Sequence, residues 1–264
     1  YRALPQLSSL FAHMGIDALK GEQESMKLPF TAPRCILSTE IDSARQLIIC
    51  DLPFNQVRNL ARRSGGSIND VLLAVCGGAL RRYLLQQDSL PRRSLVAGLP
   101  VSIKASGQQA GNQISFILCP FFTTEKDDFT RLQRVIKTTR KAKSELAEMS
   151  TTANQDFTNL LMMPTVLLTL TGNATRVTPV INAIFSNVPG SPEKLYLEGA
   201  ELEGLYPLSV VTDSMGLNLT VISYSNKLCF AVTSCPTEQP GIDALGPLLK
   251  SSFRELQRSA KERL

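Results

Sequence analysis

The apolar positions of this chain recur with two different spacings, and these separate predicted helices from predicted strands. A spacing of three to four residues is typical of a helix with one buried face, whereas alternation or a short apolar run is typical of a strand. The predicted helices cover residues 53–65, 67–87, 127–149, 153–170 and 241–262, and the predicted strands cover residues 45–52, 94–103, 113–122, 180–185, 194–197, 217–224 and 228–233. Helices and strands mixed in this order, with a hairpin turn at residues 225–227, predict an α/β fold with a two-layer mixed β-sheet covered by helices.

Proline and glycine interrupt this pattern in two places. The helix predicted over residues 153–170 contains Pro164, and we expect a kink or a break there because proline donates no helical hydrogen bond. The first 33 residues show little periodicity and contain Pro5, Gly15, Gly21, Pro29 and Pro33. We therefore expect residues 1–44 to be a connecting arm and residues 45–264 to form one compact domain.

A polar pair opens the otherwise apolar helix predicted over residues 67–87. Ser67 and Asp70 have the spacing of a capping box, which places Asn69 and Asp70 in the first helical turn. Free backbone N–H groups and the positive end of the helix dipole favour anions at this position. Asp70 then either caps the helix and does nothing more, or belongs to a site that holds developing negative charge.

Composition is that of an ordinary globular protein, with 43% hydrophobic and 19% charged residues. No stretch reaches the roughly 18–20 apolar residues that a membrane-spanning helix needs. The cysteines show no Cys-x-x-Cys spacing and mostly lie in apolar runs, which predicts buried free thiols in a reducing compartment. One histidine with scattered cysteines does not supply about four clustered ligands for zinc, so no metal is expected.

The net charge of +5 is concentrated in one predicted helix. Its cations are Arg131, Arg134, Lys137, Arg140, Lys141 and Lys143. The simplest interpretation is a solvated face on a packed helix. An anionic membrane surface or the phosphates of a nucleotide-bearing substrate are the functional alternatives. Nucleic acid is disfavoured because the run has no interleaved aromatic residues.

Few residues suit a catalytic base. The only histidine, His13, has the spacing His-x-x-x-Asp with Asp17, which is used in acyl transfer. It lies in the arm, however, with Ala18 where a turn glycine would help, so a surface histidine is expected.

Two other segments combine polar residues with glycine between apolar strands. One runs from Ser186 through Asn187 and Pro189 to Gly190, and the other contains Ser209, Asp213, Gly216, Leu217 and Asn218. Glycine at position 216 lets the backbone approach a ligand or another strand closely. Read singly, each segment is a turn between strands.

Taken together, these segments resemble the bacterial wax ester synthase/diacylglycerol acyltransferase family. The resemblance covers residues 45–235 and rests on Ser67-Ile-Asn-Asp70, Gly77-Gly-Ala-Leu-Arg-Arg-Tyr-Leu84, Ala110-Gly-Asn-Gln-Ile-Ser115, Asn187-Val-Pro-Gly190 and Met215-Gly-Leu-Asn218. It departs from the family pattern at Ser191, which is inserted before Pro192, and at Ser214, where glycine is common.

The resemblance implies the chloramphenicol acetyltransferase-like fold of coenzyme A-dependent acyltransferases, in which two similar α/β domains enclose the active site. Residues 45–264 would be the C-terminal acyltransferase domain, and residues 1–44 the arm from a missing N-terminal domain. The family's His-His-x-x-x-Asp-Gly motif is not found upstream of Asn69 in this sequence. The general-base histidine is therefore expected from that other domain.

The implied reaction is attack of a long-chain alcohol or diacylglycerol hydroxyl on the thioester of acyl-CoA, which is a substrate rather than a bound cofactor. Asn69 would donate to the oxyanion or orient the histidine, and Asp70 would hold the helix start. The expected substrate-binding residues are Ser186, Asn187, Pro189, Gly190, Ser209, Asp213, Gly216, Leu217 and Asn218. Localisation would be cytoplasmic, with peripheral attachment to membrane or lipid inclusions. The alternatives are a non-catalytic lipid-surface binding or scaffolding domain, and a condensation-domain relative that uses carrier-bound substrates.

Overall fold

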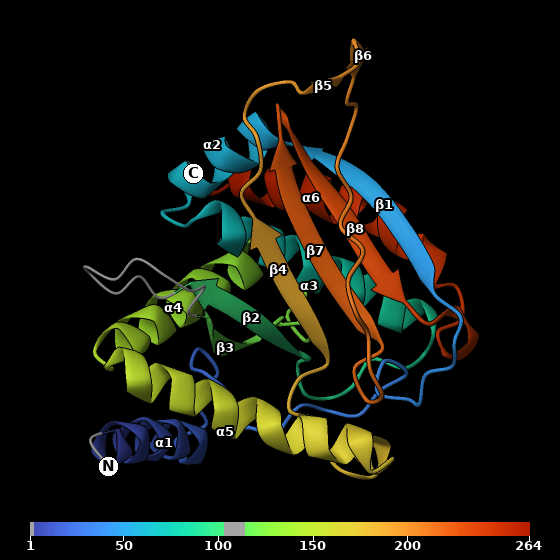
Figure 1. Cartoon of the computed structure of the whole chain (residues 1–264). Helices are drawn as coiled ribbons and strands as arrows, with labels where there is room; N and C mark the ends of the chain where they lie inside the picture. The colour runs from blue at the N-terminus through green and yellow to red at the C-terminus, as the bar shows by residue number, and fades with distance from the viewer. Residues whose placement is uncertain (1–2, 103–113) are drawn as a thin grey trace.

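A six-stranded mixed sheet runs through the centre of the chain (Figure 1). The computed structural model describes residues 3–102 and 114–264, so the loop predicted at residues 107–112 and the motif residues 110–113 lie outside it. The strands are β1 (Gln46–Pro53), β2 (Val96–Ser102), β3 (Ile114–Pro120), β4 (Ala183–Val188), β7 (Leu217–Tyr224) and β8 (Lys227–Ser234), in the order β1-β8-β7-β4-β2-β3. The pairs β7/β4 and β4/β2 are parallel and the other three are antiparallel, which confirms the mixed α/β fold.

Helices cover the sheet and extend beyond its lower edge in Figure 1. They are α1 (Leu4–Leu19), α2 (Phe54–Arg63), α3 (Ile68–Gln86), α4 (Asp128–Ala147), α5 (Thr151–Leu170) and α6 (Leu245–Lys261). Three short 3-10 turns, η1 (Ala174–Arg176), η2 (Pro236–Glu238) and η3 (Ile242–Ala244), and a small hairpin, β5 (Tyr196–Leu197) with β6 (Ala200–Glu201), complete the described elements. None of the described helices is long and apolar enough to cross a membrane.

The helix α3 lies at the centre of the helical layer, behind the sheet in Figure 1. It packs against α2, α4 and α6, and nearly all of its residues from Asp70 to Leu84 are buried. Gly77 permits this packing, since a Cβ there would lie 2.1 Å from the carbonyl oxygen of Phe121. Any larger residue at position 77 would push α3 away from the segment that follows β3.

The structure corrects the sequence-based expectations about elements in two places. Residues 4–19, for which no regular element was expected, form the helix α1, which buries Leu7, Leu10 and Met14 on one face. Pro5 is tolerated because it occupies the first turn, where the backbone N–H has no helical partner. The helix α5 continues through Pro164, so the expected break does not occur, whereas a kink at Pro164 stays a prediction.

The basic run predicted from the sequence lies on α4, and most of its cations are paired. Arg134 Nε lies 2.9 Å from a carboxylate oxygen of Glu24, and Lys137 Nζ lies 3.2 Å from the other. Lys141 Nζ lies 2.6 Å from Asp17 Oδ2. Arg131 is buried and pairs with Asp128. The expected solvated face is therefore wrong for the buried Arg131. Arg134, Lys137 and Lys141 instead attach α4 to α1 and the segment after it, and Lys137 remains exposed.

All six cysteines are free thiols. Cys35 is half-buried and the remaining five are buried. Burial raises the pKa of the Cys50 thiol to about 12 and also raises the pKa of Cys76 and Cys119. These thiols are therefore protonated and unreactive in the folded chain.

The first turn of α4 generates a pH-dependent prediction. Asp127 accepts hydrogen bonds from the backbone N–H of Thr130 at 2.7 Å, from Ser259 Oγ at 3.0 Å and from Arg263 Nη1 at 2.7 Å. Burial alone would raise the pKa of Asp127, but these hydrogen bonds outweigh it and lower the pKa from 3.8 to about 2. The stabilisation is thus present above about pH 4 and is lost as the pH falls through 2.

We expect Asp127→Ala to lower the free energy of unfolding by about 1 kcal/mol at pH 7, as for other lost N-caps. The difference from the unaltered chain should shrink between pH 4 and pH 2, as measured by urea unfolding. Asp156→Ala is the control, since the Asp156 carboxylate makes no hydrogen bond within the described residues. A difference that stays constant down to pH 2 would contradict this account.

Candidate functional site

The start of α3 contains the capping box that the sequence predicted. The carboxylate oxygen Oδ2 of Asp70 accepts hydrogen bonds from the backbone N–H of Ser67 at 2.8 Å and from Ser67 Oγ at 2.7 Å. Ser67 Oγ in turn accepts from the backbone N–H of Asp70 at 3.3 Å. The second oxygen, Oδ1, accepts from Thr139 Oγ1 on α4 at 2.7 Å. Both carboxylate oxygens are therefore occupied, and Asp70 is only 4% exposed.

Further contacts hold the turn before α3 against α4. Gln133 Nε2 donates to the carbonyl oxygen of Ser64 at 3.3 Å, and Arg140 Nη2 donates to that of Gly65 at 3.0 Å. A Cβ at Gly66 would lie 2.6 Å from Ile136 Cδ1, so a larger residue there would displace the Ile136 side chain or move the turn away from α4. We call residues 64–70, together with these α4 side chains, the clamped turn.

Asn69 lies in the clamped turn, but its side chain takes no part in the hydrogen bonds that hold the turn. The residue is half-buried, and no hydrogen bond within residues 3–102 and 114–264 uses its side-chain amide. The sequence predicted Asn69 as the donor and Asp70 as the structural partner. Asp70 is fully hydrogen bonded, whereas the Asn69 amide makes no hydrogen bond within the described residues. The roles themselves stay a prediction.

Ser186 and Asn187 lie on β4, next to the point where the sheet divides. They pair with Thr220 and Val221 of β7. On the other side, β2 pairs with β4 only up to Ile184, and the two strands diverge beyond it (Figure 1). Both predicted residues are half-buried along this diverging edge.

The turn after β4 is fastened to the β7/β8 hairpin. Gly190 donates its backbone N–H to Ser223 Oγ at 3.0 Å, and the carbonyl oxygen of Ser191 accepts from the N–H of Ser225 at 2.8 Å. A Cβ at Gly190 would lie 2.1 Å from the carbonyl oxygen of Ser223, so this turn requires glycine. Pro189 is exposed at its tip.

Ser209 and Asn218 are brought together across β7 and β8. The backbone N–H of Ser209 donates to Thr233 Oγ1 at 3.2 Å, and its hydroxyl lies 2.9 Å from Thr220 Oγ1. Thr220 Oγ1 donates to Asn218 Oδ1 at 2.9 Å, and Asn218 Nδ2 donates to the carbonyl oxygen of Val210 at 3.2 Å. The segment around Ser209 is therefore tied to the face of the sheet.

The remaining predicted residues attach residues 37–41 to the sheet. Asp213 Oδ1 accepts from the backbone N–H of Ile41 at 2.9 Å, and Gly216 donates its N–H to the carbonyl oxygen of Leu37 at 2.9 Å. A Cβ at Gly216 would lie 2.4 Å from Gln239 Nε2, so the close approach expected at this glycine is to Leu37 and Gln239. Leu217 is fully buried.

The predicted site residues thus fall into two groups. Asn69 and Asp70 belong to the helical layer, whereas Ser209, Asn218 and the two glycine turns belong to the sheet and its loops. Within the described part of the chain, no hydrogen bond joins the two groups. Sequence reasoning missed Thr139, Ser223 and Gln239, whose partners are distant along the chain and which carry no local motif.

Comparison with protein-family models shows which family this chain belongs to. The model of the wax ester synthase/diacylglycerol acyltransferase C-terminal domain matches residues 110–257, and that of the catalytic domain matches residues 2–72. The chain belongs to the wax ester synthase/diacylglycerol acyltransferase family. The resemblance inferred from the motifs is thereby confirmed.

Individual relatives agree with this assignment. A putative diacylglycerol O-acyltransferase of Mycobacterium tuberculosis is 35% identical over 90% of this chain and 53% of its own length. The O-acyltransferase WSD of Acinetobacter baylyi is 34% identical over 82% of this chain and 47% of its own length. This chain thus spans about half the length of the curated relatives it matches.

Solved structures extend the likeness to the fold. The wax ester synthase/diacylglycerol acyltransferase from Marinobacter aquaeolei VT8 matches with a TM-score of 0.77 at 28% identity, over 97% of this chain and 57% of that one. The starter condensation domain of rhizomide synthetase matches with a TM-score of 0.54 at 15% identity, over 97% of this chain and 53% of that one, which shows a shared fold alone. No group of three or more His, Cys, Asp or Glu side chains among the described residues is placed to hold a metal ion.

The clamped turn predicts a specific stability effect at Thr139. Thr139→Val would leave Asp70 Oδ1 buried without a donor, and we expect a loss of about 1–3 kcal/mol in the free energy of unfolding. Thr138→Val is a matched control on the same helix, because the Thr138 hydroxyl donates to the carbonyl oxygen of Arg134 in its own helix. Urea unfolding of both variants makes the comparison, and equal losses would contradict the proposed role of Thr139.

The departure from the family pattern at Ser214 generates a second stability prediction. Ser214 has a φ of 67°, in the left-handed region that favours glycine, and its buried hydroxyl has no partner within the described residues. Glycine relieves this strain, but it also makes the unfolded chain more flexible, which offsets part of the gain. Ser214→Gly should therefore stabilise the chain by about 0.5–1 kcal/mol. Ser214→Ala removes the hydroxyl but keeps the strain, so thermal unfolding should rank glycine above alanine. The reverse order would exclude strain at this position.

Proposed function

We propose that this chain is the C-terminal half of an O-acyltransferase that moves a fatty acyl group from acyl-CoA to a long-chain alcohol, to diacylglycerol, or to both. Membership of the wax ester synthase/diacylglycerol acyltransferase family supports the reaction class. The observation that carries the proposal is the clamped turn, which places the half-buried Asn69 amide at the start of α3 while Asp70 and α4 hold the backbone.

Asn69 has the properties of a group that stabilises an oxyanion. When the hydroxyl of the acceptor attacks the thioester, negative charge collects on the carbonyl oxygen. A donor held rigidly beside that oxygen costs no reorganisation when the charge develops. The same amide could instead orient the general-base imidazole by accepting its N–H, and either role requires the fixed backbone that the clamped turn provides.

The general base is proposed to come from an N-terminal domain with the His-His-x-x-x-Asp-Gly motif. His13, the only histidine of this sequence, is exposed on α1 beside Gln6, Glu145 and Glu148. No hydrogen bond within the described residues connects it with the clamped turn. A histidine from outside this chain would take the proton from the acceptor hydroxyl and return it to the leaving thiol.

Exposed apolar side chains suit contact with such a domain. Leu47 and Ile49 of β1 are exposed on the opposite face from the buried Ile48 and Cys50. The β5/β6 hairpin projects from the end of the sheet in Figure 1, and its Leu197 is 77% exposed. Apolar surface of this kind is typical of an interface with another domain.

The substrate-binding residues are proposed on the same basis. Ser186 and Asn187 line the diverging edge of β4, and Pro189 and Gly190 form the turn that follows. The Ser209 hydroxyl contacts Thr220 of the neighbouring β7. Acyl-CoA is the proposed acyl donor.

We propose cytoplasmic localisation, with peripheral attachment to membrane or lipid inclusions because the proposed acceptors are apolar. The paired cations of α4 do not support such attachment, whereas exposed apolar residues of α5 do. These residues are Leu160, Met163, Val166, Leu167 and Leu170.

The activity test uses this chain together with the N-terminal domain. Asn69→Ala should lower kcat by about 10²- to 10³-fold, the usual loss for one oxyanion donor. Asn226→Ala, in the exposed turn between β7 and β8, is the matched control and should leave kcat unchanged. Turnover of acyl-CoA with a long-chain alcohol and with diacylglycerol is measured beside the unfolding midpoint of each variant.

Two outcomes would reject parts of this proposal. If Asn69→Ala stayed within a few-fold of the unaltered enzyme, Asn69 would not be the donor. If the enzyme used carrier-bound acyl groups and not acyl-CoA, the chain would act as a condensation domain. If it used neither acyl donor, a non-catalytic lipid-binding role would remain.

A further inference from the structure

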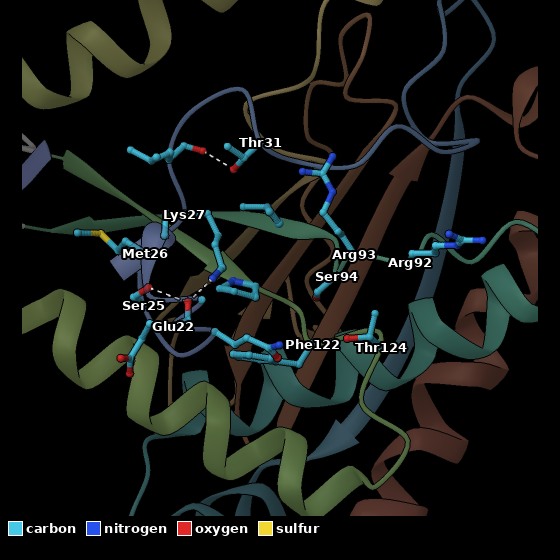
Figure 2. Close-up of a pocket in the computed structure, with 16 residues that line it drawn as sticks. Glu22, Ser25, Met26, Lys27, Thr31, Arg92, Arg93, Ser94, Phe122 and Thr124 are labelled. Atoms are coloured by element: carbon cyan, nitrogen blue, oxygen red, sulfur yellow. Dashed lines mark hydrogen bonds between the residues drawn. The ribbon is translucent and has the colours of Figure 1, made fainter. Parts of the chain in front are cut away.

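A cavity of about 370 Å³ lies between the segment that follows α1 and the beginning of β2 (Figure 2). Residues 18–31 form one wall, residues 92–96 form the opposite wall, and residues 120–124 complete the lining. None of the residues assigned to acyl transfer lines this cavity. Its size falls in the range of pockets that bind small molecules.

The cavity combines cationic side chains with apolar ones. Lys27, Arg92 and Arg93 line it together with Met26 and Phe122. In Figure 2, Lys27 and Arg93 lie on opposite sides of the space, with the Lys27 ammonium group directed down toward Phe122 and the Arg93 guanidinium group directed upward. The guanidinium group of Arg92 points outward. Such a lining suits a molecule with an anionic end and a less polar body.

Lys27 retains hydrogen-bonding capacity. Its ammonium group donates to the carbonyl oxygen of Glu22 at 3.0 Å, and within the described residues no carboxylate lies within 4.0 Å of it. Lys27 is half-buried, and this burial lowers its pKa. An ammonium group has three N–H donors, so Lys27 can make further bonds to a ligand.

The nearby acids are directed toward α4. Glu22 lines the cavity, but its carboxylate lies 3.8 Å from Lys137 Nζ. Glu24 pairs with Arg134 and Lys137. Arg92 and Arg93 make no ion pair in the part of the chain that the structure describes. The cavity therefore keeps a positive charge that its own carboxylates do not neutralise.

We propose that this cavity binds a phosphate monoester, with the phosphate at the Lys27 ammonium group and Arg93 as the cation of the opposite, exposed wall. The attached organic group would lie against the apolar part of the lining. Arginine can bind phosphate oxygens through two parallel N–H groups, and lysine adds a compact positive charge. The phosphate could belong to an adenosine nucleotide, such as the 3′-phosphate of an acyl-CoA donor, or to a phosphorylated glycerol. Only the assignment to acyl-CoA rests on the proposed function.

Calorimetric titration of the 264-residue chain distinguishes these sources. The probes are adenosine 3′,5′-bisphosphate, glycerol 3-phosphate and unphosphorylated adenosine. The proposal expects at least one phosphate compound to bind at least about tenfold more tightly than adenosine, with affinity that falls as salt is added. Tighter binding of the bisphosphate identifies the nucleotide source, and tighter binding of glycerol 3-phosphate identifies the other. Binding of neither phosphate compound above the level of adenosine overturns the proposal.

Variants assign the binding to this cavity. Lys27→Met should weaken the phosphate compound about tenfold or more, as expected for a lost charge-assisted hydrogen bond, whereas Lys27→Arg should retain most of the affinity. Lys250→Met is the matched control at an exposed lysine of α6 and should bind normally. Circular dichroism checks that each variant is folded. Unchanged affinity in both Lys27→Met and Arg93→Gln would overturn the site.

Binding is measured here without turnover, so its outcome is independent of the acyl-transfer assay. An enzyme that transfers acyl groups but binds no phosphate compound at Lys27 would reject the cavity alone. A chain that binds a phosphate compound but transfers no acyl group would reject the proposed function alone.

Discussion

The burial of the Asp70 carboxylate against α4 is the interaction on which the candidate site depends. A carboxylate leaves water at acceptable cost only when its oxygens are hydrogen bonded, and here the donors are the Ser67 N–H, the Ser67 hydroxyl and the Thr139 hydroxyl. A shift of α3 along α4 would leave this group without donors. The position of Asn69 one residue earlier is therefore coupled to the packing of two helices and not to the turn alone.

The sheet is positioned through the same helix. Because α3 packs on α2, α4 and α6, the close approach at Gly77 sets the distance between the helical layer and the segment after β3. On the other side of the fold, Gly190 sets the distance between the turn after β4 and the β7/β8 hairpin. Neither position tolerates a Cβ without movement of backbone, so two single residues constrain the spacing of large elements.

The net charge of +5 does not show which cations are already paired with carboxylates within the chain. Several cations of α4 are paired within the chain, where they hold α1 through Asp17 and the segment after it through Glu24. Lys27, Arg92 and Arg93, which line the cavity, are among the cations that make no ion pair within the described residues. These residues belong to two segments about 65 positions apart in the sequence, so no run of basic residues marks them.

Local signals were read correctly from the sequence, and contacts between distant segments were not. The capping box of Ser67 and Asp70 involves residues three positions apart, and the β7/β8 hairpin has its turn residues in place. Thr139 is 69 positions from Asp70, and its hydroxyl carries no sequence mark that would identify it as a partner.

The helix α1 was missed for another reason. Its buried stripe of Leu7, Leu10 and Met14 is short and shares the segment with Pro5 and Gly15, which usually end elements. The family resemblance predicted the fold, and the capping-box spacing placed Asn69 and Asp70 at the start of a helix. The neighbours of Gly216, which are Leu37 and Gln239, became known only from the three-dimensional arrangement.

The buried thiols have a practical consequence for following this protein in solution. Thiol reagents react with the thiolate, and Cys76 and Cys119 are both inaccessible and protonated in the folded chain. Cys76 lies on α3 and Cys119 lies on β3, one in each layer. The rate at which a thiol reagent labels each cysteine therefore reports how often its own layer opens, so local unfolding of the two layers is followed at native residues without a substitution.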